Sequence, residues 1–250
     1  MLLLAPGRAF PQGQITFNNR VNNVVIAPVY GLEADPHLAK HGNTASGTPA
    51  GIQSYAGALL AGTAFTAQLF AGPTNASEAE LKPLQPPVSF RTGDAAGFVV
   101  APTFSLAVPS VDEGEPAQVR LRVWNNRSGT ITNWQQVLED MTIERGQSLS
   151  LISEPLGGIF IPPPNLNGLR SFNLALGEPP RLEIGVANSA PALVLFGSAG
   201  LRYELQFRPS LDSQFGWQTL TNFVLPNNAT IIPDSAAGAP ARFYQAVQIH

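Results

Sequence analysis

The pattern of apolar and polar positions is clearest in two stretches, residues 65–73 and 117–124, which alternate with a period of two. In the first stretch, one face carries Phe65, Ala67 and Leu69. In the second, apolar residues occupy one face and polar residues the other: Val119, Leu121 and Val123 against Gln118, Arg120 and Arg122. This period is typical of a strand with one buried face. The two stretches are therefore predicted to be the central strands of a β-sandwich.

Shorter apolar runs between turn residues predict further strands at residues 14–19, 24–30, 88–91, 97–100, 104–109, 147–152 and 169–174. Residues 32–60 are rich in Gly, Ser and Ala, and we expect a long surface loop there with one helical turn at 36–40. Ser77 and Glu80 form a capping-box pattern that predicts one further turn. One helix of about two turns, capped by Asn133, is predicted from apolar residues at helical spacing: Trp134, Val137, Leu138 and Met141.

The chain becomes rich in Pro and Gly after residue 154, and Pro179-Pro180 is the predicted domain boundary. Beyond it, up to seven short strands are expected in about 70 residues, with residues 197–200 as a hairpin turn. The predicted fold class is all-β with two β-sandwich domains. Residues 13–178 would form a larger jelly-roll or immunoglobulin-like domain, and residues 179–250 a small fibronectin type III or immunoglobulin-like module.

Composition narrows the range of partners. The 250 residues include 14 basic and 17 acidic ones, which gives a net charge of −3 and no electrostatic footprint for nucleic acid. There is no cysteine, which excludes disulfides, thiolate nucleophiles and cysteine-based metal sites. No apolar run approaches the roughly 20 residues needed to span a bilayer. Residues 1–12 resemble the end of an export signal, with a disordered terminus as the alternative.

Several short motifs together carry a resemblance. They lie at residues 13–21, 65–73, 90–93, 122–124, 134–141, 146–148 and 163–172. The set resembles a group of uncharacterised secreted proteins of environmental bacteria, many of which end in a PEP-CTERM sorting tail. The resemblance covers about residues 13–176. It implies an exported bacterial protein at the cell surface or in the medium, and no function comes with it.

The tail resembles a different module. Its motifs are Tyr203-Glu-Leu-Gln-Phe, Ser210-Leu-Asp, Trp217-Gln-Thr-Leu, Asp234 and Arg242-Phe-Tyr. They look like a fibronectin-type module found near the C-termini of large exported proteins from the same bacteria. The chain departs from the first group because it stops at Ile249-His250 without the sorting tail. We therefore do not expect anchoring by that route.

Two sets of residues are candidate metal ligands. His37 and His41 have the i, i+4 spacing of a metal-binding pair, although the glutamate of a zincin motif is missing. Asp112 and Glu113 lie in a predicted turn, and such oxygen donors bind calcium in some extracellular sandwiches. The plainer interpretation is a solvated loop in the first case and ordinary turn chemistry in the second. The expected cofactor is none, with calcium as the alternative.

Catalytic constellations are scarce. With three His and no Gly-x-Ser-x-Gly elbow, a Ser-His-Asp hydrolase is not expected. Glu139 and Asp140 could form an acidic pair for hydrolysis of a polysaccharide, but such residues usually form the solvated face of a helix. No phosphate loop or dinucleotide fingerprint occurs. We therefore expect no enzymatic activity.

Aromatic residues offer the remaining candidate site. Trp124 and Trp134, with Arg120 and Arg122 beside Trp124, could form a platform that stacks on sugar rings. The favoured interpretation, however, is that the helix carrying Trp134 covers Trp124 and closes a secondary core. The expected function is a non-catalytic structural or adhesion protein that contacts extracellular protein or glycan partners, with a carbohydrate-binding module as the alternative. The oligomeric state is left open.

Overall fold

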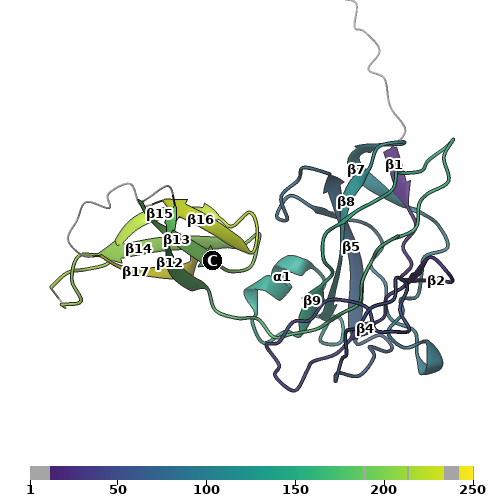
Figure 1. Ribbon diagram of the computed structural model, residues 1–250, viewed down its shortest axis with the longest axis horizontal. Helices are drawn as coiled ribbons and strands as arrows, with labels where there is room; N and C mark the ends of the chain where they lie inside the picture. The colour runs from purple at the N-terminus through teal and green to yellow at the C-terminus, as the bar shows by residue number, and fades with distance from the viewer. Residues whose placement is uncertain (1–11, 188–189, 213, 234–241, 250) are drawn as a thin grey trace, which may run out of the picture. The chain divides into compact units, whose positions relative to one another are not determined.

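A computed structural model of the chain describes residues 12–187, 190–212, 214–233 and 242–249 (Figure 1). Residues 1–11 of the predicted signal remnant, and Asp234 of the tail motif, lie outside the described residues. The fold is nearly all-β, as predicted, and its described residues contain a single α-helix. Contacts divide the chain into two compact units. The first unit comprises Met1–Ala76, Leu81–Thr132 and Glu144–Leu176, and the second comprises Ser77–Glu80, Asn133–Ile143 and Gly177–His250.

The first unit is built on two long strands, β5 (Phe65–Pro73) and β8 (Ala117–Asn125), which lie side by side in Figure 1. They pair antiparallel over their whole length, from Phe65 opposite Asn125 to Pro73 opposite Ala117. Both correspond closely to the strands that the alternation predicts. Three short strands complete this sheet: β6 (Lys82–Pro83), β9 (Arg145–Gln147) and β10 (Leu151–Ile152).

Three short pairs of strands surround this sheet. β1 (Gln12–Ile15) pairs antiparallel with β7 (Leu106–Asp112), and β2 (Arg20–Val21) pairs antiparallel with β3 (Val25–Ile26). The third pair, β4 (Val29–Tyr30) and β11 (Phe172–Asn173), is parallel. The predicted strand at 24–30 is thus broken into two pieces, because Pro28 has no N–H to donate to a ladder.

The core of the first unit lies against the apolar face of β5 and β8. Its buried side chains include Ala67, Leu69, Val119, Leu121 and Val123. The opposite face of these strands is also covered, which the alternation did not predict. Gln68 and Arg122 are buried there, and the polar group of each has a partner. The Gln68 amide donates to the carbonyl of Leu84. The Arg122 guanidinium donates to the side chain of Gln147 and stacks over the ring of Phe70.

Several predicted elements are shorter or absent. The predicted helical turn at 36–40 is absent: residues 35–38 form a single turn closed by a bond from the Leu38 N–H to the Asp35 carbonyl. Residues 88–91 and 97–100 take part only in isolated bridges, and the predicted strand at 147–152 is split between β9 and β10. A single 3-10 turn, η1 (Gly93–Ala95), connects the two bridged segments. Irregular backbone is therefore more extensive in this unit than the apolar runs suggest.

The second unit contains the helix α1 (Trp134–Glu139). Asn133 caps it as predicted, and a complete capping box joins Asn133 and Gln136. The helix ends at Glu139, so Met141 lies beyond it and is exposed. The predicted turn before it is also present, because the Glu80 carboxylate accepts bonds from the backbone and hydroxyl of Ser77.

Six strands of the second unit form two three-stranded antiparallel sheets (Figure 1). The first sheet has the order β12-β13-β16, with bounds Arg181–Ala187, Ala190–Phe196 and Ala229–Pro233. The second has the order β15-β14-β17, with bounds Gln218–Val224, Arg202–Arg208 and Phe243–Ile249. Residues 197–200 connect β13 to β14. The predicted hairpin there is wrong, because these strands belong to different sheets.

The two sheets enclose a small sandwich-like core. Its fully or nearly fully buried residues include Leu193 and Leu195 on β13 and Tyr203 and Leu205 on β14. The Tyr203 hydroxyl accepts a bond from the backbone N–H of Ser198, which fixes the connection between the sheets. Few side chains of the two edge strands β15 and β17 point into this core deeply enough to be buried.

We expect Leu121→Ala to destabilise the first unit by about 3 kcal/mol, because Leu121 is fully buried between two covered faces. Urea unfolding followed by the fluorescence of buried Trp124 measures this loss. Ile52→Ala is the control, since Ile52 is fully exposed and its truncation should change the free energy of unfolding by less than about 0.5 kcal/mol. Equal effects of the two substitutions would contradict this assignment of the core.

Candidate functional site

The two tryptophans of the expected sugar platform are not on the surface. Trp124 is fully buried on β8, and its indole N–H donates to the Ile131 carbonyl at 3.2 Å. Trp134 is buried on α1. Stacking on a sugar requires an exposed ring face, so neither residue can form the expected platform in this structure. The burial of Trp124 agrees with the interpretation favoured from the sequence, that this ring is covered and belongs to a core.

The two arginines expected beside Trp124 are engaged within the chain. The Arg120 guanidinium donates to the Ser148 carbonyl at 3.0 Å. Arg122 lies 4.3 Å from the centre of the Phe70 ring and donates to the side chain of Gln147. These contacts connect β8 to Phe70 of β5, to Gln147 of β9 and to Ser148, the residue that follows β9.

The predicted metal ligands do not come together. His37 and His41 are both exposed residues, and Nε2 of His41 lies 3.0 Å from the Gln147 carbonyl. Partial desolvation of its ring lowers the pKa of His41, partly opposed by this bond and assisted by the charge of Arg120. Asp112 lies at the end of β7, opposite Gln12. In the part of the chain that the structure describes, no group of three or more His, Asp or Glu side chains is arranged to hold a metal ion.

The acidic pair also has local roles. Glu139 accepts a bond from the side chain of Gln135, one turn earlier on α1. Asp140 follows the helix and accepts two bonds from Thr142, through its backbone N–H and its hydroxyl. Both carboxylates thus help to form and end the helix. Among the described residues, no helix combines the length and apolar character needed to cross a bilayer.

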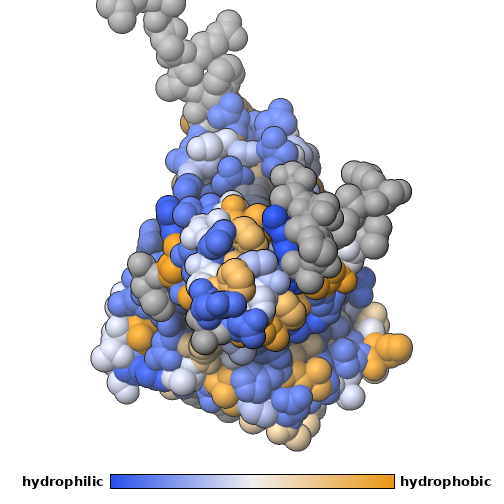
Figure 2. Space-filling view, turned by 90° about the vertical axis from the view of Figure 1, so that its left-hand side faces the viewer, coloured by the Kyte–Doolittle hydropathy of each residue, from blue (hydrophilic) through white to orange (hydrophobic). Residues whose placement is uncertain are grey.

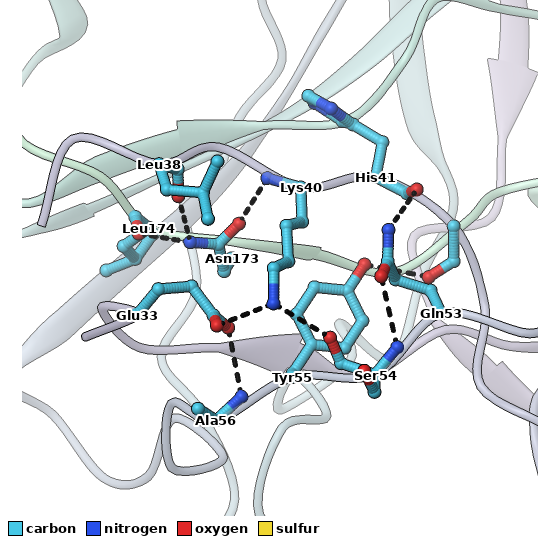
Figure 3. Close-up of polar contacts among 11 residues, drawn as sticks. Glu33, Leu38, Lys40, His41, Gln53, Ser54, Tyr55, Ala56, Asn173 and Leu174 are labelled. Carbon is cyan, nitrogen blue, oxygen red and sulfur yellow. Dashed lines mark hydrogen bonds and ion pairs between the residues drawn. The ribbon is translucent and has the colours of Figure 1, made fainter. Parts of the chain in front are cut away.

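The long loop at 32–60 is fixed by a polar network (Figure 3). The Lys40 ammonium lies 2.7 Å from Glu33 Oε2 and also donates to the Ser54 carbonyl. Glu33 is buried, and its other oxygen accepts from the N–H of Ala56. The bond from Lys40 lowers the pKa of Glu33, opposed by burial and assisted by bonds from the backbone of Ala56 and Gly57.

Two further contacts attach this loop to β4 and β11. Tyr55 stacks on Tyr30 of β4, with ring centres 4.1 Å apart, and its hydroxyl contacts the carbonyls of Gly42 and Ser171. Burial raises the pKa of Tyr55. Asn173 of β11 accepts from the N–H of Lys40 and donates to the Leu38 carbonyl. All the contacts dashed in Figure 3 join groups of this chain to one another, so we assign this network a structural role.

A different arrangement surrounds Glu113. Its carboxylate accepts hydrogen bonds from three consecutive backbone N–H groups, those of Ile159 at 3.1 Å, Phe160 at 2.7 Å and Ile161 at 2.7 Å. Burial alone would raise the pKa of Glu113, but these bonds outweigh it and lower the pKa. Gly158 makes the approach feasible, because a Cβ there would lie 2.7 Å from the Glu113 carboxyl carbon. Glu113 therefore holds the loop in one conformation.

This carboxylate holds an exposed apolar tip, which we define as residues 159–161. Ile159 exposes 76% and Phe160 85% of the accessible surface, and Ile161 is also exposed. The tip lies between Gly157-Gly158 and three prolines, 162–164, and the prolines restrict the backbone on its C-terminal side. Bulky apolar residues at consecutive exposed positions cost solubility and are typical of a contact surface.

The segments around the tip carry only negative charge. Exposed carboxylates lie on Asp112, Glu115 and Glu154, and neither 105–119 nor 148–164 contains a Lys, Arg or His. Backbone bonds between Leu156 and Glu115 and between Gly114 and Leu156 bring the two segments together. The two segments therefore combine the exposed apolar tip with exposed acidic side chains and contain no basic residue.

Comparison with known proteins gives no help in assigning this site, since no protein-family model and no curated protein matches the chain. Of the residues proposed from the sequence, only Glu113 belongs to the tip's support. The tip itself was not predicted, although its signal is visible as three bulky apolar residues between Gly-Gly and Pro-Pro-Pro.

We expect Lys40→Met to lower the stability of the first unit by about 2 kcal/mol at pH 7, because it leaves the buried Glu33 without its cation. A carboxyl whose pKa is lower in the folded state stabilises the fold above its unfolded pKa, here 4.5, and loses that contribution as the pH falls. The difference in the free energy of unfolding between the wild type and Lys40→Met, measured with urea, should therefore become smaller below pH 4.5.

Lys82→Met is the control, because Lys82 is exposed. A difference between the wild type and Lys40→Met that does not change with pH would contradict the role assigned to Lys40.

We expect Glu113→Gln to release the tip. An amide has one acceptor oxygen and a donor NH2 group, so it cannot accept all three N–H bonds. Hydrogen exchange at the amides of residues 159–161 should become roughly tenfold faster. Glu115→Gln removes the same charge two residues away, from a side chain that is exposed, and should leave exchange at the tip unchanged. Unchanged protection in Glu113→Gln would show that the carboxylate does not hold the loop.

Proposed function

We propose that this protein is a non-catalytic adhesion or structural protein, secreted or held at the cell surface, which contacts a partner protein through the tip at residues 159–161. One observation carries the proposal: Phe160 is almost fully exposed while the backbone beneath it is fixed by Glu113. The Phe160 side chain packs little against its own chain, although its backbone is fixed, and this combination fits contact with another molecule.

The support for the tip matters for the free energy of binding. Burying a Phe or Ile side chain against a partner contributes about 1.5–3 kcal/mol. If the loop were flexible, the conformational entropy lost on binding would offset much of that gain. Because Glu113 orders residues 159–161 in the free protein, this entropy is lost when the protein folds and not when it binds. The tip is therefore suited to act as an anchor residue cluster of the kind that dominates protein interfaces.

Charge favours one kind of partner. The acidic groups around the tip would be repelled by an anionic membrane surface, and no basic residue in the two flanking segments offsets them. A protein pocket lined by apolar residues and rimmed by Lys or Arg complements both features. We therefore propose a protein partner of this type over a lipid surface.

The other functions considered from the sequence have less support. A glycan platform built on Trp124 and Trp134 requires exposed rings, and both rings are buried. Hydrolysis by Glu139 and Asp140 requires free carboxylates, and both accept local bonds at the end of α1. Export is part of the proposal, and it rests on the resemblance of residues 13–176 to secreted bacterial proteins.

The proposal is tested by placing the photo-reactive residue p-benzoylphenylalanine at position 160 and irradiating cells of the source organism. We expect crosslinking to one protein species. Phe104 provides a matched control, because it is also an exposed Phe, at 60% of its surface, but its backbone accepts no comparable support from Glu113. Crosslinking from position 104 should not yield the same product.

The purified partner then gives the affinity test. We expect Phe160→Ser to weaken binding by at least about tenfold, the factor that corresponds to about 1.4 kcal/mol, and Phe104→Ser to leave it unchanged. Equal products from positions 160 and 104 would contradict the proposal. So would Phe160-dependent binding to phosphatidylcholine vesicles without any protein product, which would point to lipid as the surface contacted.

A further inference from the structure

We propose that the outer face of the sheet β15-β14-β17 in the second unit binds an uncharged polysaccharide. This face, which we call the outer face, lies opposite to the one that carries the buried side chains of Tyr203 and Leu205. It includes neither Trp124 nor Trp134, so it is distinct from the glycan platform considered from the sequence. The proposal does not depend on the contact proposed for the tip.

The register of the strands determines which side chains lie on the outer face, because side chains alternate along a strand and directly opposed residues face the same side. On β14, the residues that alternate with Tyr203 and Leu205 point outward: Glu204, Gln206 and Arg208. Their neighbours on the two flanking strands are Thr219 and Asn222 on β15 and Phe243, Gln245 and Val247 on β17. None of these side chains on the outer face is buried.

A row of hydrogen-bonded polar side chains crosses the outer face. The Glu204 carboxylate accepts bonds from the Thr219 hydroxyl and from the Gln206 amide, the latter at 3.1 Å. The amide oxygen of Gln206 accepts in turn from Gln245. The bonds from Thr219 and Gln206 lower the pKa of Glu204, although desolvation opposes them. Three strands thus present ordered donors and acceptors around an ionised carboxylate.

Aromatic side chains border this polar row. Trp217, which directly precedes β15, is partly exposed, and the Arg208 guanidinium lies 4.5 Å from the centre of its ring. Phe243 lies opposite Arg208 on β17 and is 38% exposed. Among the described residues, Nε of Arg208 has no hydrogen-bond partner although it is shielded from solvent. In Figure 2, hydrophobic and hydrophilic side chains likewise alternate at the surface.

This combination of groups matches the two kinds of surface on a sugar unit. Sugar hydroxyls both donate and accept hydrogen bonds, as amide side chains do, and a guanidinium supplies further donors. The C–H face of a sugar ring packs on an aromatic ring. The charge of Glu204 favours hydroxyl groups over the carboxylates or sulfates of an acidic chain. The centre of a protein interface is usually poor in charge, so a protein partner fits this face less well.

The first experiment measures how dissolved polysaccharides retard the full chain in native gel electrophoresis. The probes are xylan, galactomannan and mixed-linkage β-glucan, with alginate as the acidic comparison. We expect at least one uncharged probe to retard the wild type. Gln206→Ala should weaken this binding roughly tenfold, because it breaks the polar row on both sides of Gln206. Gln218→Ala is the matched control, since Gln218 is exposed on β15 but faces the other side, opposite Phe207.

The second experiment uses tryptophan fluorescence to locate the bound sugar. Of the three tryptophans, Trp124 and Trp134 are buried, so Trp217 should account for most of the quenching by acrylamide. The uncharged polysaccharide that retards the chain should reduce this quenching. Trp217→Phe should remove the signal, and Trp217→Ala should weaken binding roughly tenfold. Circular dichroism of each variant checks that the fold is kept.

The outcomes decide the proposal. Binding that is weakened by Gln206→Ala and Trp217→Ala, and kept in Gln218→Ala, supports the outer face as the site. The proposal is overturned if no uncharged probe retards the wild type, if alginate alone does, or if the retardation is the same in all three variants. Phe160→Ser should bind the polysaccharide like the wild type, so this test and the test of the tip can fail independently.

Discussion

The full-length pairing of β5 with β8 is the constraint on which the first unit depends. In the middle of both strands the side chains of both faces are buried, so the polar residues there must be satisfied inside the protein. Gln68 does this through the Leu84 carbonyl, and Arg122 through Phe70 and Gln147. These bonds determine which segments can cover the second face, and they explain why short, irregular strands surround a regular pair. A solvated face would have required no such partners.

The same requirement organises the rest of the unit, where side chains replace regular ladders. Asn19 is fully buried and joins three backbone groups, from Ala27, Gly97 and Val99. Asn43 and Asn173 make equivalent connections for the loop at 32–60 and for β11. The amide side chain offers both donors and an acceptor, so it can hold irregular backbone in place of a neighbouring strand. A large share of the fold is therefore stabilised by individual side chains.

This explains how far the sequence could predict the structure. Period-two alternation located β5 and β8, and the spacing from Asn133 to Leu138 located α1, because both patterns are local. The positions of Asn19, Asn43 and Glu33 in the network depend on partners far along the chain, which no local pattern reveals. Glu113 shows the same limit, because a carboxylate in a turn can either coordinate a metal ion or accept hydrogen bonds from N–H groups. The sequence singled out this residue as a possible metal ligand, whereas in the structure its partners are backbone N–H groups. Alternation alone would put Trp124 on a solvated face, so its burial could be favoured only by assuming that another element covers that face.

The support of the tip by Glu113 has a consequence for how the protein can change. The bonds that shape the loop go to backbone N–H groups, which every residue except proline supplies. Side chains at positions 159 and 160 contribute little to the core, since they are almost fully exposed. For the contact proposed above, substitution there would alter what is recognised at little cost in folding, whereas Glu113 and Gly158 would have to be retained. The proposed contact and the support of the loop thus depend on different residues, so the specificity of the proposed contact can diverge while its geometry is kept.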